Sequence, residues 1–431
     1  MRTHYIGELA GLGDGAEVTV SGWVNESRDL KKILFIVLRD KTGMIQVTAK
    51  QGQLDDSVME ALRCPKETVV SVTGKLVRGG GANAGVEILA TGAKVLGKVY
   101  GKVPFDITDK EAVPDLDFRI DNRHIDLRRP EVQAIFRVRA TVQQSFREHL
   151  LGQGFDEIVP SLIVAAATEG GAELFPVVYF EREAFLAQSP QLYKQMAVVG
   201  GLDRVFMQVP VFRAEPHNTT THLNEVYQMD VEMGFVDDDG AMDMLESTFI
   251  HILNSVREKR KTELETLNSP LTVPEGIPRK TYSELIELLK DNGETIEWGD
   301  DFTRAQERRI GELIKSEAYF ITRWPTKVRA FYSMPTEDNV EVCKAFDLIY
   351  RGLEMSSGAQ RIHDPELLAQ QIRARGLNPE NFEFYIRAFR AGAPPHGGWS
   401  IGAERLTMKL CGLDNIREAV LYPRDRNRIF P

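Results

Sequence analysis

The chain has 431 residues, of which 42% are hydrophobic and 27% charged, and its formal net charge is −10. This length exceeds one ordinary core and predicts two or three domains, and the composition excludes a disordered or fibrous chain. No run of 18 apolar residues and no secretory signal pattern occur, so we expect a cytoplasmic protein without a membrane partner. The acidic total argues against general nucleic-acid binding. Residues 1–102 nevertheless carry 14 Lys and Arg against 11 Asp and Glu, a net of +3.

Residues 1–102 have the pattern of an all-β domain, with a short helix expected near 54–63. The expected strands are 18–24, 33–40, 44–49, 68–76 and 86–89. Five strands with one helix between the third and fourth is the order of the OB-fold, a barrel that often binds oligonucleotides. An SH3-like barrel or a plain β-module fits the same alternation.

Residues 103–130 are rich in Pro, Asp and Arg and are predicted to form a hinge or linker. A long amphipathic helix is expected from Pro130 to about Gly152. In the remainder, 131–431, strand-like runs joined by short turns predict an α+β domain with an antiparallel sheet flanked by helices. No G-x-G-x-x-G or G-x-x-x-x-G-K-[ST] motif occurs, which excludes the Rossmann and P-loop folds.

Helices interrupt this sheet pattern in the middle of the chain and predict a helical insertion at about 238–317. The expected helices are 238–265, 282–292 and 302–317. Strands are expected again at 319–322 and 329–332, where apolar and aromatic residues cluster.

Two stretches of this second domain have the residue types of an anion and metal site. Arg213 closes one strand-like run and a polar loop follows it, so the strand arginine and loop side chains could clamp a triphosphate. An exposed hairpin loop is the alternative. Asp347 and Glu354 lie on a strand and the turn after it and could hold Mg²⁺. A salt bridge of either carboxylate with Arg351 is the alternative.

A third stretch, Pro394 to Leu406, has glycines at 397, 398 and 402 and leads into an amphipathic helix expected from Glu404 to Cys411, with Arg405 in its first turn. Glycines leave room for a flat ligand against the backbone, and an arginine over such a floor could stack on a base or pair with phosphate. A glycine-rich hairpin with a surface arginine is the alternative.

Together, three blocks resemble the signature motifs of the class II aminoacyl-tRNA synthetases. They are Gly154–Pro160, Phe212–Glu215 and Gly402–Arg405. With the OB-fold and linker, they resemble the aspartyl, asparaginyl and lysyl subgroup over essentially the whole chain. The resemblance implies an anticodon-binding domain at 1–102, a catalytic domain at 131–431, and a homodimer formed through the first motif.

Within the subgroup, the block Ala187 to Gln195 resembles the aspartyl enzymes, and the chain as a whole resembles their compact archaeal type. The resemblance implies that Lys194 and Arg361 hold the side-chain carboxylate of aspartate, which suits a pair of cations better than an amide does. Asparaginyl enzymes typically carry an acidic residue near that lysine. The other implied aspartate contacts are Glu169, Gln191, Asp230, Glu232 and Ser357.

The resemblance further implies ATP as a substrate and Mg²⁺ held by Asp347 and Glu354. Arg213 would stabilise charge on the α-phosphate, and Arg405 would contact the γ-phosphate and adenine. The remaining implied ATP contacts are Glu215, His222, Leu223, Glu354 and Gly402. The implied product is aspartyl-adenylate, from which aspartate passes to tRNA-Asp; transfer to tRNA-Asn stays open.

On the OB-fold, the resemblance implies anticodon contacts by four residues: Arg28, Phe35, Gln46 and Glu87. An exposed aromatic such as Phe35 can stack on a splayed base. Burial of Phe35 in the barrel core is the alternative.

Two positions depart from the family pattern. Thr221 stands where relatives commonly have an arginine before His222, and Val226 stands where many have a phenylalanine against adenine. The stacking partner of adenine could then be Tyr227, His222 or Arg405 alone. Rival functions are an asparaginyl enzyme, an asparagine synthetase on the same catalytic fold, and a catalytically inactive RNA-binding relative.

Overall fold

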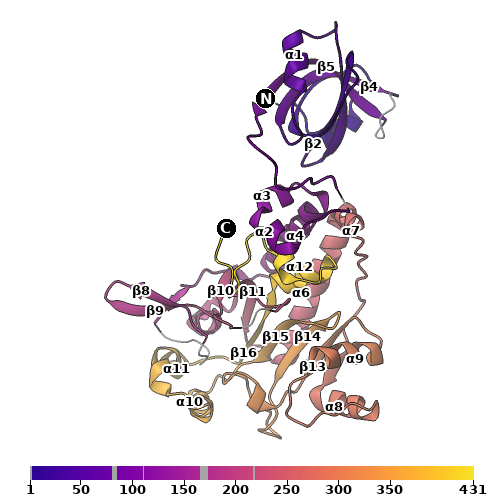
Figure 1. Ribbon diagram of the computed structural model, residues 1–431. Helices are drawn as coiled ribbons and strands as arrows, with labels where there is room; N and C mark the ends of the chain where they lie inside the picture. The colour runs from indigo at the N-terminus through magenta and orange to yellow at the C-terminus, as the bar shows by residue number, and fades with distance from the viewer. Residues whose placement is uncertain (1, 80–84, 110, 166–172, 217–218) are drawn as a thin grey trace. The chain divides into compact units, whose positions relative to one another are not determined.

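The computed structural model describes residues 2–79, 85–109, 111–165, 173–216 and 219–431 (Figure 1). It divides into two compact units, Met1–Asp115 and Leu116–Pro431. The division falls within the segment 103–130 for which a linker is predicted. No helix in the described ranges is long and apolar enough to cross a membrane.

The first unit is a closed barrel with the strand order β1-β2-β3-β5-β4. Its elements are η1 (Ile6–Gly11), β1 (Glu17–Asp29), β2 (Ile33–Asp40), β3 (Gly43–Lys50), α1 (Asp56–Leu62), β4 (Val69–Arg78) and β5 (Val86–Gly97). Alternate side chains such as Val20, Ile36 and Val72 fill the barrel, which explains the alternation in the sequence. At Gly74 a Cβ would lie 2.2 Å from the Leu89 carbonyl oxygen, so the close approach of β4 and β5 requires glycine. This strand order, with α1 between β3 and β4, confirms the predicted OB-fold.

The second unit contains an eight-stranded sheet in the order β12-β13-β14-β15-β16-β11-β10-β6. The strands are β6 (Asp156–Glu157), β10 (Arg204–Phe212), β11 (Glu225–Gly234), β12 (Arg279–Thr281), β13 (Ala318–Thr322), β14 (Ala345–Tyr350), β15 (Glu354–Gln360) and β16 (His396–Gly402). Neighbours are antiparallel except β6 with β10 and β12 with β13. A separate sheet holds β7 (Ile163–Val164), β8 (Pro176–Tyr179) and β9 (Arg182–Leu186). The antiparallel-rich sheet confirms the predicted fold class.

Helices cover this sheet. They are α2 (Leu116–Asp121), α3 (Arg123–Asp126), α4 (Pro130–Gly152), α5 (Gln191–Ala197), α6 (Asp238–Lys259), α7 (Lys261–Thr266), α8 (Tyr282–Asp291), α9 (Arg304–Ile314), α10 (Pro365–Ala374), α11 (Glu383–Arg390) and α12 (Ala403–Leu410). The main core joins α4, α6 and α12 to the sheet. The helix α6 lies in the range predicted as an insertion, but it contributes Leu245 and Phe249 to this main core. The helices α8 and α9 pack in a different apolar cluster, beside β13 (Figure 1).

The side chains of β11 alternate between the two faces of the sheet, and this alternation places its charged residues on one face. Met229 and Val231 lie in the main core. Because successive side chains of a strand point to opposite faces, Asp230 and Glu232 project from the other face of the sheet. Ser400 of the neighbouring strand pairs with Asp230 in register and joins it there.

The predicted strand at 329–332 is wrong. A short 3-10 helix, η3 (Thr326–Val328), and a turn occupy this part of the chain. Phe331 packs edge-on against Phe382, with ring centroids 5.4 Å apart, in a cluster with α10 and α11. The apolar residues there anchor a loop instead of forming a strand.

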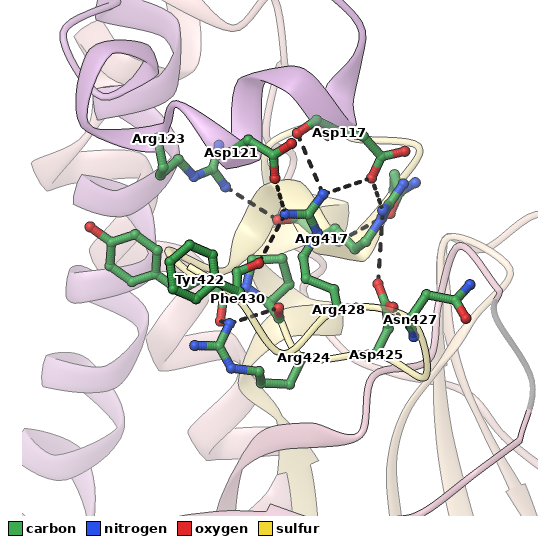
Figure 2. A network of polar contacts seen from close by, with 12 residues as sticks. Asp117, Asp121, Arg123, Arg417, Tyr422, Arg424, Asp425, Asn427, Arg428 and Phe430 are labelled. Atoms are coloured by element: carbon green, nitrogen blue, oxygen red, sulfur yellow. Dashed lines mark hydrogen bonds and ion pairs between the residues drawn. The ribbon is translucent and has the colours of Figure 1, made fainter.

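The C-terminal segment is fastened to α2 by charged side chains (Figure 2). Arg428 donates to Asp121 Oδ1 at 2.5 Å and to Asp117 Oδ1 at 3.2 Å. The same segment reaches the loop after β10, because the Arg424 carbonyl accepts a hydrogen bond from the Asn224 N–H at 2.8 Å. The chain end therefore helps to hold the loop that follows Arg213.

Candidate functional site

A cavity of about 340 Å³ opens on the face of the large sheet to which Asp230 and Ser400 point. Most of the predicted site residues line it. They are Gln191, Lys194, Arg213, Glu215, His222, Leu223, Asp230, Glu354, Ser357, Arg361, Gly402 and Arg405. Glu232 and Asp347 lie buried beside the cavity without lining it, and Glu169 falls outside the described residues. The fold thus brings together residues that are far apart in the sequence.

One end of the cavity is a buried network of two cations and two carboxylates. Lys194, from α5, donates to Asp230 Oδ1 at 2.7 Å and lies 3.5 Å from Glu232 Oε2. Arg361 donates to the two carboxylate oxygens of Glu232 at 2.9 and 3.2 Å. Ser400 donates to the second oxygen of Asp230 at 3.1 Å. The four charges balance, so this end is preorganised to accept a ligand that carries both signs.

Opposite charges control the ionisation of Glu232. Its burial would raise the pKa of this carboxyl, but the neighbouring Arg361 and Lys194 outweigh burial and lower the pKa. Glu232 is therefore an anion in the folded protein, and each cation of the network keeps a charged partner.

A second layer of neutral polar groups lies behind Arg361. The Tyr385 hydroxyl donates to Gln195 Oε1 at 2.9 Å, and Gln195 Nε2 lies 3.0 Å from His396 Nε2. His396 Nδ1 lies 2.9 Å from the Pro394 carbonyl oxygen and donates to it in the neutral tautomer. Burial lowers the pKa of His396, which agrees with a neutral ring. The backbone N–H of Arg361 donates to the His396 carbonyl oxygen at 2.7 Å, which connects this layer to the strand end that carries Arg361.

The other end of the cavity is rich in arginine. Arg213 stands at the end of β10, where Asn224 Nδ2 donates to its backbone carbonyl at 2.6 Å. Its guanidinium has no carboxylate partner among the residues that the structure describes. Arg405, from α12, donates to the Glu354 carbonyl oxygen at 3.2 Å and lies 3.4 Å from His222 Nε2. This end can bind a polyanion.

The glycines of β16 do not all serve the role predicted for them. At Gly398 a Cβ would lie 2.2 Å from the Val231 carbonyl oxygen and 2.3 Å from Glu232 Oε2, so this glycine admits the neighbouring strand and its carboxylate. Gly402 lines the cavity, and only the Arg405 side chain lies within 4 Å of a Cβ there. Of these two, only Gly402 leaves room for a ligand.

The two predicted metal ligands are not held together as a ready-made site. Asp347 pairs with Arg329, and no group of three or more His, Cys, Asp or Glu side chains in the described ranges is arranged to hold a metal ion. Burial raises the pKa of Asp347 to about 6, against the lowering effect of Arg329. Its Oδ1 is buried and has no hydrogen-bond partner among the described residues, although Ser357 lies near enough to lower the pKa. With Glu354 nearby, these oxygens fit the hard cation Mg²⁺ in donor chemistry.

Glu307, from α9, faces the same carboxylates. Burial, together with repulsion from Glu354 and Asp347, raises its pKa to about 8 against the lowering effect of Arg405. The folded protein therefore keeps a proton on Glu307 at pH values where the unfolded chain, with an ordinary pKa near 4.3, has lost it.

Glu307→Gln should reveal this as a pH-dependent gain in stability. Because the raised pKa favours the protonated carboxyl, the stability of the unmodified chain falls as pH rises from about 5 to 8, and the variant lacks this loss. We expect the unfolding free energy of the variant, relative to the parent, to increase by roughly 3 kcal/mol over that range. Urea unfolding in the presence of EDTA measures it. A difference that shrinks with rising pH would contradict the assignment.

The cavity wall around the expected adenine position includes Val226 and His222. Tyr227 does not line the cavity; its N–H donates to Glu404 Oε2 at 3.0 Å. Of the three stacking partners considered from the sequence, His222 and Arg405 lie at the cavity and Tyr227 does not.

A second concave surface lies on the barrel. Arg28, Phe35, Gln46 and Glu87 all line it. Leu34 and Ile36 point into the core, so Phe35 points outward and is only partly buried. Glu87 accepts hydrogen bonds from Gln46 at 2.8 Å and from Thr48 at 2.7 Å. The structure thus excludes the alternative that Phe35 is a core residue.

Three residues at the large cavity were not singled out from the sequence. Ser400 contacts Asp230, Arg329 pairs with Asp347, and Arg304 of α9 donates to Thr221. Each reaches its partner across a long stretch of chain, and no local pattern marks such a contact. An arginine at the start of a polar helix resembles any solvated surface residue.

Comparisons with known proteins identify relatives of both units. The family described as "tRNA synthetases class II (D, K and N)" matches residues 115–426, and an "OB-fold nucleic acid binding domain" matches residues 18–96. The aspartate–tRNA(Asp/Asn) ligase of Methanocaldococcus jannaschii is 48% identical over 100% of this chain and 98% of its own. The aspartate–tRNA(Asp) ligase of Pyrococcus abyssi is 47% identical over 100% of both chains.

Solved structures agree on the fold. Asparaginyl-tRNA synthetase from Pyrococcus horikoshii, complexed with asparaginyl-adenylate, has a TM-score of 0.91 and 32% identity, covering 97% of each chain. Aspartyl-tRNA synthetase from Entamoeba histolytica has a TM-score of 0.87 and 32% identity, covering 99% of this chain and 92% of its own.

Proposed function

Because this chain belongs to the class II tRNA synthetases of the aspartyl, lysyl and asparaginyl group, we propose that it is an aspartate–tRNA ligase. It activates aspartate with ATP to aspartyl-adenylate, releases pyrophosphate, and transfers the aspartyl group to the 3′ end of tRNA-Asp. The names of the relatives at 47–48% identity support aspartate as the amino acid. Since the substrates are ATP and tRNA, we place the reaction in the cytoplasm.

Two buried cations, Lys194 and Arg361, determine the preference for aspartate over asparagine in this proposal. Both are nitrogen donors without an acceptor atom, so the side-chain carboxylate of aspartate can accept charge-assisted hydrogen bonds from both. The amide of asparagine would present its NH₂ group to a donor on one side. Asp230 and Glu232 lie next to these cations and can receive the ammonium of the substrate.

The arginine-rich end serves ATP in this proposal. Arg213 stabilises the negative charge that develops on the α-phosphate when the aspartate carboxylate attacks it, and Arg405 holds the outer phosphates over Gly402. Glu215, His222 and Leu223 complete the nucleotide contacts. Asp347 and Glu354 would hold Mg²⁺, which offsets phosphate charge when bound. Positioning and electrostatics drive the reaction, so no protein nucleophile is required.

Charging of purified tRNAs tests the proposal. Labelled aspartate should become acid-precipitable with tRNA-Asp in the presence of ATP and Mg²⁺, and AMP should accumulate. Charging with asparagine in place of aspartate would overturn the assignment. Relatives are named both for tRNA-Asp alone and for tRNA-Asp with tRNA-Asn, so a parallel assay with tRNA-Asn decides the range of this enzyme.

The barrel face that carries Phe35 is proposed to bind the anticodon. Phe35→Ala should raise the KM for tRNA about tenfold, since stacking of an aromatic ring on a base contributes about 1–3 kcal/mol. Pyrophosphate exchange, which needs no tRNA, should not change. Met44→Ala, an exposed apolar residue on the next strand that lies outside this surface, is the matched control. An unchanged KM for tRNA in the Phe35 variant would contradict the proposal.

We also propose a homodimer formed through the first motif. Val159 in this motif exposes 86% of its surface, and Val178 and Phe180 in the neighbouring hairpin β8–β9 are similarly exposed. Apolar side chains in such number suit a partner surface. Sedimentation as a monomer at micromolar concentration would contradict it.

A further inference from the structure

The first turn of α9 places Arg304 next to a lining residue of the arginine-rich end of the cavity, which is called the nucleotide end below. Arg304 Nη2 donates to the Thr221 hydroxyl, and Thr221 lines the cavity. The same hydroxyl lies 3.3 Å from His222 Nδ1, and His222 Nε2 lies 3.4 Å from Arg405 Nη2. A chain of polar contacts therefore runs from α9 to α12 across this end of the cavity.

The element that carries Arg304 is firmly held. Thr303 and Gln306 form a capping box at the start of α9, with the Gln306 Oε1 accepting from the Thr303 N–H at 2.9 Å. Ile310 is buried, and the Tyr319 hydroxyl donates to the Glu307 carbonyl oxygen at 2.6 Å. One turn after Arg304, Glu307 faces Glu354 and Asp347. This face of the helix is therefore directed at the nucleotide end.

The charge of Arg304 is available for a ligand. Its side chain is exposed, and no carboxylate pairs with it in the part of the chain that the structure describes. Arg213 is similarly unpaired, whereas Arg405 lies 3.8 Å from a Glu354 oxygen. Burial is the main cause that lowers the pKa of His222; three nearby arginines lower it further, whereas Glu215 raises it. These arginines are Arg405, Arg304 and Arg213, so all three cations lie around one imidazole.

We propose that Arg304 binds the outer phosphates of ATP and places a positive charge beside Thr221 of the loop after β10. The inference rests on the proposed function. Thr221 itself carries no charge, and a guanidinium from another element hydrogen-bonds to it. A guanidinium offers a fork of donors that suits phosphate oxygens, and it keeps further donors free while one nitrogen holds Thr221.

Binding of ATP and AMP to the full chain, measured by calorimetry without aspartate, tests the proposal. Arg304→Ala should weaken ATP binding about tenfold, as expected for one charge-assisted contact, and leave AMP binding unchanged. Arg304→Lys should retain more ATP affinity than Arg304→Gln, because only lysine keeps the charge. Arg309→Ala is the matched control, since Arg309 lies on the same helix and pairs with Glu312 at 3.3 Å.

A rescue variant separates phosphate binding from loop support. Thr221→Arg combined with Arg304→Ala should recover most of the lost ATP affinity, because the charge returns from the loop. Equal ATP binding by Arg304→Ala and the parent would overturn the proposal. Equal losses for ATP and AMP, or a Gln variant that binds ATP like the parent, would also overturn it, since Arg304 would then act only by holding Thr221.

The same variants in pyrophosphate exchange keep this inference distinct from the proposed function. The KM for ATP should rise about tenfold in Arg304→Ala, and the KM for aspartate should stay within about twofold. If the parent chain shows no exchange with any amino acid, the proposed function fails, and the contrast between ATP and AMP still decides the role of Arg304.

Discussion

Lys194→Met should lower aspartate-dependent pyrophosphate exchange by about a hundred- to thousandfold, measured as kcat/KM for aspartate. The lysine is fully buried between Asp230 and Glu232, and its loss removes one of the two cations proposed to hold the substrate carboxylate. Removing one partner of a buried, hydrogen-bonded charge pair has an effect of about 2–5 kcal/mol. The two carboxylates that remain would also repel the aspartate side chain.

The variant should also be less stable, because Asp230 and Glu232 lose a buried counterion. We expect a loss of about 3–5 kcal/mol in unfolding free energy. Calorimetric ATP binding well below the melting temperature shows whether the nucleotide end is intact, and we expect it to be unchanged. Lys259→Met, which breaks the exposed pair with Glu148, is the control and should alter neither property. Aspartate kinetics like those of the parent would show that Lys194 does not contact the substrate.

Arg213→Ala should lower kcat for exchange by about a hundred- to thousandfold with little change in stability. The reason is that its guanidinium is proposed to stabilise charge that develops only as the α-phosphate is attacked. No ion pair of the described residues is broken by the substitution. Asn224 Nδ2 donates to the Arg213 carbonyl oxygen and the Arg213 N–H donates to the Asn224 carbonyl oxygen, so both hydrogen bonds use the backbone of Arg213.

A control from the same strand sharpens this test. Arg204 begins β10 and lies over the Phe155 ring at 5.6 Å, far along the strand from the cavity residues. Arg204→Ala should leave exchange kinetics unchanged. If Arg213→Ala raised only the KM for ATP and kept kcat, Arg213 would bind ground-state nucleotide without stabilising the transition state.

Much of the fold could be predicted because its signals are local. The alternation of apolar and polar residues identified the barrel strands, and Pro130 and Gly152 mark the two ends of α4. The strand predicted at 329–332 failed because a cluster of apolar and aromatic residues also occurs where Phe331 anchors a loop in a separate apolar cluster. Such residues indicate burial, and a loop can bury them without strand pairing.

The sequence pointed to residues most of which the fold brings together at one cavity, but it did not reveal their contacts. Arg213, Asp347 and Arg405 could be chosen from their motifs. The pairing of Lys194 with Asp230, of Arg361 with Glu232, and of Asp347 with Arg329 depends on strands and helices that meet only in the folded chain. No sequence pattern encodes such long-range pairs.

Gly398 and Arg304 also show that membership in a sequence motif does not predict a residue's contacts. Gly398 lies in a motif that suggested a nucleotide floor, yet the neighbouring Glu232 takes the space that its missing side chain leaves. Arg304 lies outside every motif, yet it reaches the loop of the nucleotide end. A residue's place in a motif predicts its neighbourhood, whereas its contacts follow from packing.

Pyrophosphate exchange with aspartate and asparagine side by side tests the central claim most directly. The buried Lys194–Arg361 pair predicts ATP-dependent exchange with aspartate and at least about a hundredfold lower kcat/KM with asparagine. Exchange with asparagine but not with aspartate would contradict the assignment of this pocket and the proposed function with it.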